Sequence, residues 1–413
     1  MRSLFFLLII CISSPAVSQQ PTSQQFREDF EYFWNTLDRQ YAYWDNKTTD
    51  WSKVKALYAA EADTIKSKWN FTLFLERVFN EIYDPHASLS TNTSESQKLI
   101  PSGADVWASY QNGKPFITEV RLGFGAARSG LHAGMEIIAI NNVPVAEAIQ
   151  PFLPKTLVRS DAAAKNHALR IAMAGRHSQK RKITVQYQGS QNDYFPDQDT
   201  TTHYPPYQGL LASERLAGNI GYIRIHNVLW DNNLIPAFDS VMNRLMDTKG
   251  IVLDLRETPG GGNTTVARAI IGRFISKAGF YQAHELPAEE KRFGVKRSWK
   301  EIVSPRGITY TKPLVLLVNH WTGSVGEGTT IGFDALKRAT IIGTEMAGLN
   351  GANYSFQMPH TKIGFSFPAE KLFHVNGQPR ETFKPHIIVN LSEQQVGEDK
   401  ILQTALKYLY TKR

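Results

Sequence analysis

The feature that most constrains the fold is a series of short, unbroken apolar runs in the second half of the chain. The runs occupy residues 220–225, 251–255 and 314–318, and helical spacing of apolar residues follows at 234–246, 266–275 and 328–336. A strand that is apolar throughout must be covered on both faces, and alternation of such strands with helices is typical of the α/β class. We therefore expect residues 205–413 to form an α/β domain that carries the chemistry.

Residues 19–95 are predicted to form a helical region. Apolar side chains recur at helical spacing over residues 26–41 and again over residues 71–82, with Asn70 as the expected N-cap of the second helix. Proline disfavours helical geometry at the residue before it, so the sequence Asp-Pro-His that follows should end this helix. His86 is therefore expected on a turn.

Residues 96–200 are predicted to form a small β domain, because alternating runs such as 136–140 are typical of strands. Residues 126–141 resemble the helix-and-strand signature of a PDZ domain, although Met135 stands where that family usually carries Asp. The insert 150–181 is predicted to hold a helix that has no place in the PDZ pattern.

The first residues predict export. Arg2 precedes an apolar run at residues 4–12, and residues 16–18 offer a small-x-small cleavage site. We expect residues 1–18 to be a signal peptide cleaved after Ser18, which places the mature protein in the periplasm or outside the cell. A membrane anchor is the alternative, but this run falls well short of the roughly 20 residues that span a bilayer.

Composition excludes several classes of function. The single cysteine, Cys11, lies inside the expected signal peptide, which excludes a disulfide scaffold, a cysteine nucleophile and a cysteine-ligated metal in the mature chain. The net charge of +8 comes from scattered basic residues, apart from the run at 180–182, and is interpreted as solvated surface. Without a zinc-finger spacing, an RNA-binding aromatic motif or a phosphate loop, no nucleic-acid partner is expected.

Ser324 lies between glycines in residues 322–328, after one apolar run and at the start of a predicted helix. Such a serine exposes its hydroxyl, and the amides at a helix start carry partial positive charge that can hold an oxyanion. The alternative is that Ser324 only caps the helix, a common role of serine.

A second loop, at residues 257–263, contains three successive glycines after another apolar run. Glycines allow a backbone to approach a substrate closely, so this loop is interpreted as half of an oxyanion hole. The alternative is a tight strand-to-helix turn. A serine nucleophile also needs a base, and among eleven histidines the residues alone leave His86 as one of several candidates.

Together these segments resemble the carboxyl-terminal processing peptidase superfamily, which includes tail-specific proteases, the tricorn protease core and retinoid-binding modules of the photoreceptor matrix. The strongest matches are residues 219–225, 250–262 and 314–343, and weaker ones are 84–86 and 377–389. With the PDZ-like segment they cover most of the mature chain in the family's order. The resemblance implies a ClpP-like or crotonase-like core of ββα units.

The resemblance also implies which branch of the superfamily applies. The processing peptidases proper carry a lysine 25 residues after the nucleophile, where this chain has Leu349, and Lys337 matches no catalytic position. The tricorn-like branch uses an early histidine and a late glutamate, which correspond to His86 and Glu381. The implied roles are nucleophile for Ser324, general base and then acid for His86, and support of that base for Glu381.

The amides of Gly261 and Val325 would form the oxyanion hole under this resemblance. Val325 replaces an acidic residue of the tricorn branch, but only its amide is needed. His386 stands where the family often has Asp, and it is a spare candidate for the base. Glu381 is the least secure assignment, and its alternative is an ordinary exposed glutamate.

The function expected from these observations is that of an exported serine endopeptidase that needs no metal or cofactor. Its PDZ-like domain would capture an extended peptide, or the free carboxylate of a peptide, by strand addition. No stable membrane anchor is expected. The alternative is a non-catalytic protein that binds peptides or apolar ligands on the same scaffold.

Overall fold

The computed structural model describes residues 20–198, 209–392 and 397–411. The expected signal peptide therefore lies outside the described residues. Within them, no helix is long and apolar enough to cross a membrane.

The second half of the chain forms the expected α/β domain around a six-stranded sheet. Its strand order is β17 (Ile387–Ile388), β14 (Thr340–Gly343), β13 (Leu314–Val318), β10 (Gly250–Asp254), β9 (Ile220–Ile225) and β8 (Leu211–Leu216). All neighbours are parallel except β8 with β9. Every residue of β10 and β13 is buried, which confirms the interpretation of their unbroken apolar runs.

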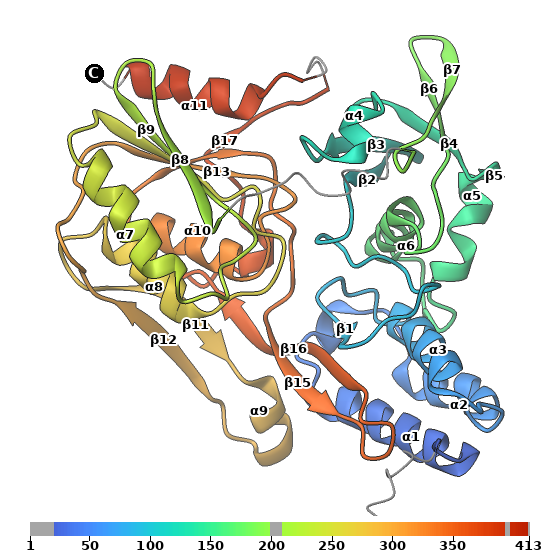
Figure 1. The fold of residues 1–413 in the computed structure, drawn as a ribbon. Coiled ribbons are helices and arrows are strands. Elements are labelled where there is room, and N and C mark those ends of the chain that lie inside the picture. The colour runs from blue at the N-terminus through green and yellow to red at the C-terminus, as the bar shows by residue number, and fades with distance from the viewer. Residues whose placement is uncertain (1–19, 199–208, 393–396, 412–413) are drawn as a thin grey trace, which may run out of the picture.

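Helices cover both faces of this sheet, as Figure 1 shows. One face packs against α7 (Leu234–Leu245), α8 (Thr264–Gly272) and α10 (Val325–Ala335), and the other packs against α11 (Lys400–Thr411). The α/β fold class is confirmed. Helix α10 begins three residues earlier than expected, because its first turn contains Gly326 and Gly328, which weaken the helical signal.

The N-terminal region is helical, as expected. It consists of α1 (Ser23–Gln40), the short 3-10 helix η1 (Trp44–Asn46), α2 (Trp51–Ala62) and α3 (Lys68–Asn80). The expected cap of α3 was wrong, because Ser67 is the N-cap and its hydroxyl accepts a hydrogen bond from the amide of Asn70 at 3.2 Å.

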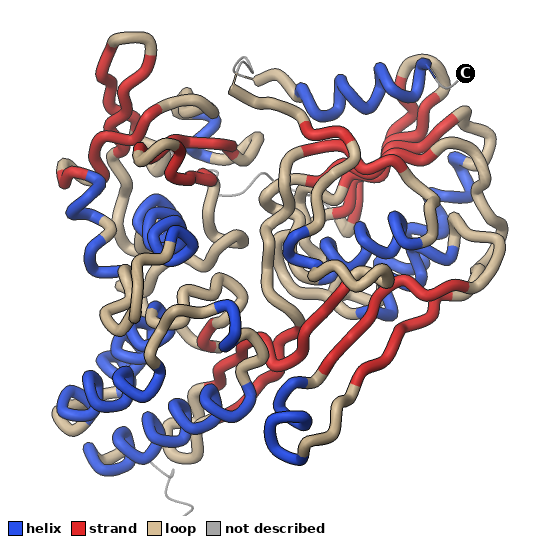
Figure 2. The backbone as a smooth tube through the Cα atoms, turned by 180° about the vertical axis from the view of Figure 1, so that it is seen from behind, coloured by secondary structure: helices blue, strands red, loops and turns tan. Residues whose placement is uncertain are grey.

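A second sheet joins the helical region to the α/β domain. Its order is β1 (Ser88–Leu89), β16 (Gly364–Phe373), β11 (Gly279–Glu285) and β12 (Ser298–Val303), with β15 (Ala352–Gln357) also on β16 and α9 (Pro287–Phe293) between β11 and β12. Seen from behind in Figure 2, these long strands run from the α/β domain toward the N-terminal helices. Phe365 and Phe367 of β16 share one core with the aromatic residues of α1 and α3.

The third part is the expected β domain. Its strands are β2 (Val106–Gln111), β3 (Lys114–Val120), β4 (Glu136–Ile140), β6 (Ile183–Tyr187) and β7 (Ser190–Tyr194) in that order, with β5 (Val143–Pro144) on β4. Its helices are α4 (Gly125–Arg128), α5 (Val145–Ala148), η2 (Gln150–Phe152) and α6 (Ala162–Ala174). Helix α6 is the one predicted within the insert 150–181.

One residue of the basic run at 180–182 is not solvated surface. Arg181 is buried and pairs with Asp105 and Asp197, each at 2.7 Å. The interpretation of the whole run as surface charge was therefore wrong at Arg181. Sequence reasoning missed this because neither carboxylate is near Arg181 in a short window, since Asp197 is 16 residues away and Asp105 is 76 residues away.

Candidate active site

Ser324 lies on the turn between β13 and α10, and its backbone is strained. Its φ is +50° and its ψ is −111°, whereas the caps Thr22 and Asn263 have ordinary extended geometry. A non-glycine residue in such a conformation costs on the order of 1–3 kcal/mol, and such strain clusters at functional sites. A serine that only caps a helix does not need a strained backbone. The strain at Ser324 therefore favours its interpretation as the nucleophile.

The serine turn (residues 322–328) and the glycine loop (residues 257–263) are packed tightly together. A Cβ atom on Gly262 would lie 2.9 Å from the Cβ of Val325, and one on Gly326 would lie 2.5 Å from the Thr258 hydroxyl. Neither contact would tolerate a side chain. The glycines therefore bring the backbone of the glycine loop directly against the start of α10.

Two backbone amides at this contact remain available. The amide of Gly260 donates to Asn227 Oδ1 at 2.7 Å, but the amides of Gly261 and Val325 donate to no group among the described residues. A Cβ atom on Gly261 would meet nothing within 4 Å, so this residue faces open space. The two amides that the sequence predicted for an oxyanion hole are thus free to bind an anion.

His86 follows α3 on the predicted turn, and its ring is held in one tautomer. Its Nδ1 lies 2.5 Å from the carbonyl oxygen of Asn350. A carbonyl oxygen only accepts, so Nδ1 carries the proton and Nε2 is left to accept one. Burial, followed by the positive charge of Arg380, lowers the pKa of His86 to about 4. The ring is therefore neutral at pH 7, which is the form that a general base needs.

Asp84 fixes the turn that carries His86. Its buried carboxylate accepts hydrogen bonds from the amide of His86 at 2.9 Å, the side chain of Asn350 at 2.8 Å and the hydroxyl of Tyr41 at 2.6 Å. Burial alone would raise the pKa of Asp84, but the charge of Lys47 and these donors outweigh it, and the pKa is lowered. Asp84 therefore stays ionised and holds both His86 and the residue that binds its ring.

Glu327 connects the serine turn to the segment that holds His86. It is fully buried and accepts hydrogen bonds from the amides of Ser324 at 2.8 Å, Gly348 at 3.0 Å and Leu349 at 3.3 Å. The next residue, Asn350, binds the ring of His86. The turn that carries Ser324 is thus linked to His86 by the hydrogen bonds of Glu327 and by the backbone from Leu349 to Asn350.

Arg380, in the short 3-10 helix η4 (Arg380–Thr382), binds the same segment from its other side. Its Nη2 donates to the carbonyl oxygens of Leu349 at 2.9 Å and Gly351 at 2.8 Å, and it lies 3.8 Å from Glu327. Burial raises the pKa of Glu327 to about 7, and Arg380 and the three amides oppose that rise. The segment at residues 348–351 is therefore fixed from both sides.

Replacing Glu327 with Gln is expected to change how stability depends on pH. Between the ordinary pKa of Glu, about 4.5, and its folded value of about 7, the folded protein binds more protons than the unfolded chain. Stability conferred at this site therefore falls as pH rises, by about 3 kcal/mol in total. Urea unfolding at pH 4.5 and pH 8 would show the wild type losing this amount relative to E327Q, and a pH-independent difference would contradict it.

Among the described residues, Glu381 makes no hydrogen bond with the ring of His86. It is partly buried, and its Oε2 is buried with no hydrogen-bond partner among the described residues. Burial raises the pKa of Glu381, and the neighbouring charge of Asp84 adds to the rise. The hydrogen bond that orients His86 comes from Asn350, so a supporting role for Glu381 stays a prediction.

His386, the spare candidate for the base, lies far from Ser324, and so does Lys337, which matches no catalytic position. His386 is bound by Asp334 at 2.7 Å and by the amide of Ile341 at 3.1 Å. Asp334 lies ten residues along α10 from Ser324, which is about 15 Å of helix. Lys337 lies beyond the end of the same helix and is exposed. Neither is placed to act as the base.

The β domain contacts both loops of the site. Glu119 of β3 is buried and accepts hydrogen bonds from Asn319 at 3.1 Å and His320 at 2.5 Å, just before the serine turn. Arg121 pairs with Glu257 of the glycine loop at 2.8 Å.

Among the described residues, no group of three or more His, Cys, Asp or Glu is arranged to hold a metal ion.

Sequence reasoning missed Glu327, Arg380, Asp84 and Asn350 as members of the site. Glu327 could have been found, because a glutamate three residues after a serine at a helix start has capping-box spacing. Asn350 acts on His86 through its backbone carbonyl, which leaves no signal in the sequence.

Known proteins resemble this chain in two segments and in its overall fold. Residues 219–389 match peptidase family S41, and residues 22–80 match the tricorn protease C1 domain. Among solved structures, mature CPAF has a TM-score of 0.62 at 14% identity and covers 94% of this chain and 96% of its own. A putative peptidase from Parabacteroides merdae has a TM-score of 0.58 at 17% identity, with 94% and 98% covered. The photosystem II D1 C-terminal processing protease has a TM-score of 0.55 at 16% identity, with 94% and 98% covered.

Proposed function

Because this chain is a serine-type peptidase with a family S41 domain, we propose that it is an exported endopeptidase in which Ser324 is the nucleophile and His86 the general base. The observation that carries the proposal is the link from Ser324 through Glu327 to the segment that orients His86. Export rests on the sequence pattern of residues 1–18 alone.

The first half of the reaction forms an acyl-enzyme. Ser324 Oγ attacks the carbonyl carbon of the peptide bond while Nε2 of His86 takes the hydroxyl proton. The negative charge that develops on the carbonyl oxygen is held by the amides of Gly261 and Val325, and one such donor is typically worth about 3 kcal/mol. The tetrahedral adduct then collapses, and His86 gives its proton to the leaving amine.

The second half releases the new carboxyl terminus. Water attacks the ester carbon while His86 again takes a proton, and the same amides hold the second oxyanion. Collapse returns the proton to Ser324 Oγ and breaks the ester bond. Throughout both halves, Nδ1 of His86 keeps its proton and donates it in a hydrogen bond to the carbonyl oxygen of Asn350, so the ring keeps its orientation. Glu381, whose Oε2 has no hydrogen-bond partner among the described residues, is the acid expected to favour the charged ring.

A binding protein on the same scaffold would not need these features. A strained serine at a helix start, a histidine held neutral and two unoccupied amides serve acyl transfer and have no evident use in passive binding. These features support the enzyme over the binder as the role of this chain.

A fluorophosphonate probe tests the proposal. We expect the folded protein to be labelled at one position, and mass spectrometry of the digested product to place the label on the peptide that contains Ser324. Heat-denatured protein is the control and should not react. Failure of the folded protein to react, or a label on another serine, would favour the binding protein.

A further inference from the structure

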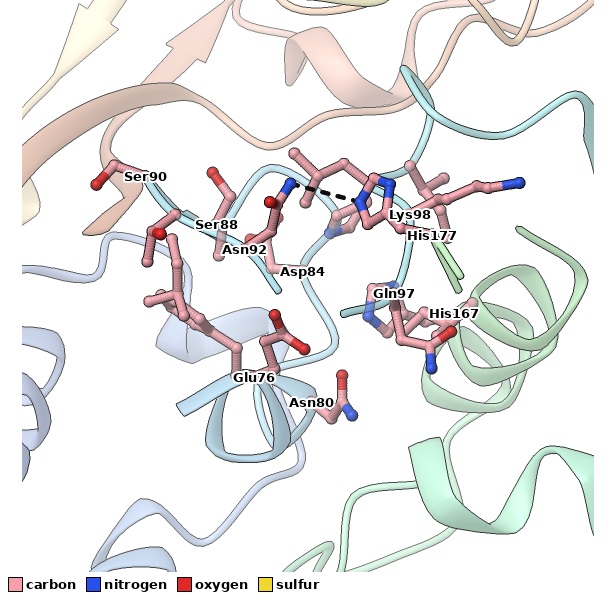
Figure 3. Close-up of a pocket in the computed structure, with 18 residues that line it drawn as sticks. Glu76, Asn80, Asp84, Ser88, Ser90, Asn92, Gln97, Lys98, His167 and His177 are labelled. Carbon is pink, nitrogen blue, oxygen red and sulfur yellow. Dashed lines mark hydrogen bonds between the residues drawn. The ribbon is translucent and has the colours of Figure 1, made fainter. Parts of the chain in front are cut away.

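A cavity of about 450 Å³ lies beside the turn that carries His86. Figure 3 shows its walls, with Glu76 and Asn80 from α3, Ser88 and Ser90 from the segment after His86, and His167 from α6. The mechanism proposed above uses none of these side chains. The cavity therefore lies next to the catalytic base without being part of it.

One wall of this cavity is an unpaired strand edge. Strand β1 pairs with β16 through Ser88, and the amide of Ser90 donates to Gly364 at 2.8 Å. In an antiparallel pair, alternate residues direct their backbone groups toward the partner, so those of Leu89 point away from β16. Outside the pairing with β16, the amide and carbonyl of Leu89 make no hydrogen bond among the described residues. Leu89 and Thr91 both line the cavity.

His167 is a buried polar group that faces the same cavity without a partner. Only 9% of the residue is exposed, and its ring makes no hydrogen bond among the described residues. Burial lowers the pKa of His167 to about 3, so the neutral ring offers one donor and one acceptor. Phe79, Leu99 and Ile171 form apolar walls around it. The cavity thus combines apolar surface with a free hydrogen-bonding group.

Strand addition was expected on the β domain, but strand β2, one of the two edges of its sheet, is occupied. The outward groups of β2 are bound by α6, because Asn166 accepts from the amide of Tyr110 at 2.8 Å and Arg170 donates to the carbonyl of Ala108 at 3.1 Å. Arg170 also lies over the ring of Trp107. A peptide could pair with β2 only after displacing these side chains.

We propose that a peptide substrate docks as an added strand on the free edge of β1 and places an apolar side chain in the adjoining cavity. The proposal rests on the proposed function and names where its substrate binds. Leu89 is three residues after His86, and three residues of strand span about 10 Å. A peptide paired with Leu89 therefore reaches the catalytic base within a few residues. The recognised substrate is an extended, unfolded segment, since only such a segment can complete a sheet edge.

Leu89→Pro tests this docking, because it removes the outward amide and leaves the pairing of Ser88 and Ser90 with β16 in place. Leu89→Ala is the matched control, which keeps the amide. The readout is the rate at which a fluorophosphonate labels Ser324, with and without a pool of randomised synthetic octapeptides as competitor. The pool should slow labelling of the wild type and of L89A, and it should compete roughly fivefold less well with L89P, the effect of one lost backbone hydrogen bond.

Ile171→Trp is a second variant that fills the cavity from α6 and leaves β1 unchanged. We expect it to lose competition by the peptide pool. The measured quantity is the ratio of its labelling rates with and without the pool, so a change in its basal rate does not enter the comparison. The double variant N166A/R170A should behave as wild type. Equal competition in the wild type, L89P and I171W, or stronger competition in N166A/R170A alone, would overturn docking at β1. Absence of competition in the wild type would overturn it too, whereas absence of labelling in the wild type would overturn the proposed function itself.

Discussion

Ser324→Ala is expected to lower kcat for cleavage of unfolded casein by about a millionfold, with residual activity from the oxyanion amides and from substrate binding. The variant cannot form the acyl bond, although the contact of Glu327 with the amide of residue 324 remains. The measurement is the initial rate of casein cleavage with a fluorogenic label. Circular dichroism serves as the control for folding. Cleavage within tenfold of the wild-type rate would show that Ser324 is not the nucleophile.

Ser324→Gly gives the same loss of activity but an unusual effect on stability. Glycine adopts the conformation at φ +50° and ψ −111° without the cost that a side chain imposes. We therefore expect S324G to unfold with a free energy about 1–2 kcal/mol higher than that of S324A. Glycine is also favoured over alanine at an ordinary N-cap, so the strain is measured by the excess of this difference over that of the same pair at Asn263, whose cap geometry is extended. Urea unfolding compares the two, and greater stability of S324A would contradict the strain at Ser324.

The α/β domain could be predicted because its information is local. Strands β9, β10 and β13 are apolar throughout, and this pattern requires a covered sheet whatever else the chain does. Strand β1 was not predicted, since two residues carry no period. It exists because Ser88 and Leu89 pair with residues of β16 that are far away in the sequence.

The active site likewise has parts that local sequence predicts and parts that depend on residues far apart in the chain. Ser324 and the glycine loop could be proposed from local sequence, because a serine at a helix start and glycines after a strand are visible in short windows. The amides of Val325 and Gly261 were implied by the resemblance. The choice of His86 depended on resemblance, since its ring meets Asn350 across 264 residues of chain. The orienting group is a backbone carbonyl, which any residue could supply. Physical reasoning from the sequence alone could not have found it.

At the position where the processing peptidases carry a catalytic lysine, this chain has Leu349, which makes backbone hydrogen bonds. Leu349 occupies that position and is buried, and its amide binds Glu327 while its carbonyl binds Arg380. The position therefore supplies backbone contacts where the processing peptidases supply a base. Those contacts fix Asn350, and Asn350 fixes the ring of His86. Under the proposed function, this segment supports a histidine from the helical region and supplies no base of its own.

His86→Ala is expected to lower kcat for casein cleavage by roughly 10⁵-fold, because the loss of a base that acts as a unit with its nucleophile costs nearly as much as the loss of the nucleophile. His386→Ala is the matched control and should stay within about twofold of the wild type, as a substitution away from the reacting groups. Comparable losses in the two variants would mean that the effect of H86A is not specific.

The pH dependence of kcat/KM gives a second, independent measure of the same base. Burial and the charge of Arg380 lower the pKa of His86 to about 4, and the protonated ring cannot accept the proton of Ser324. Activity should therefore hold as pH falls from 8 through 6 and decline only as pH approaches about 4, tenfold for each further unit. An ordinary histidine would begin this decline near pH 6.5. Rates of fluorophosphonate labelling between pH 3.5 and 8 measure the profile in the wild type and in E327Q, which lacks the titration of Glu327 near pH 7. A midpoint near 6.5 in both proteins would show that the base is a more exposed histidine than His86.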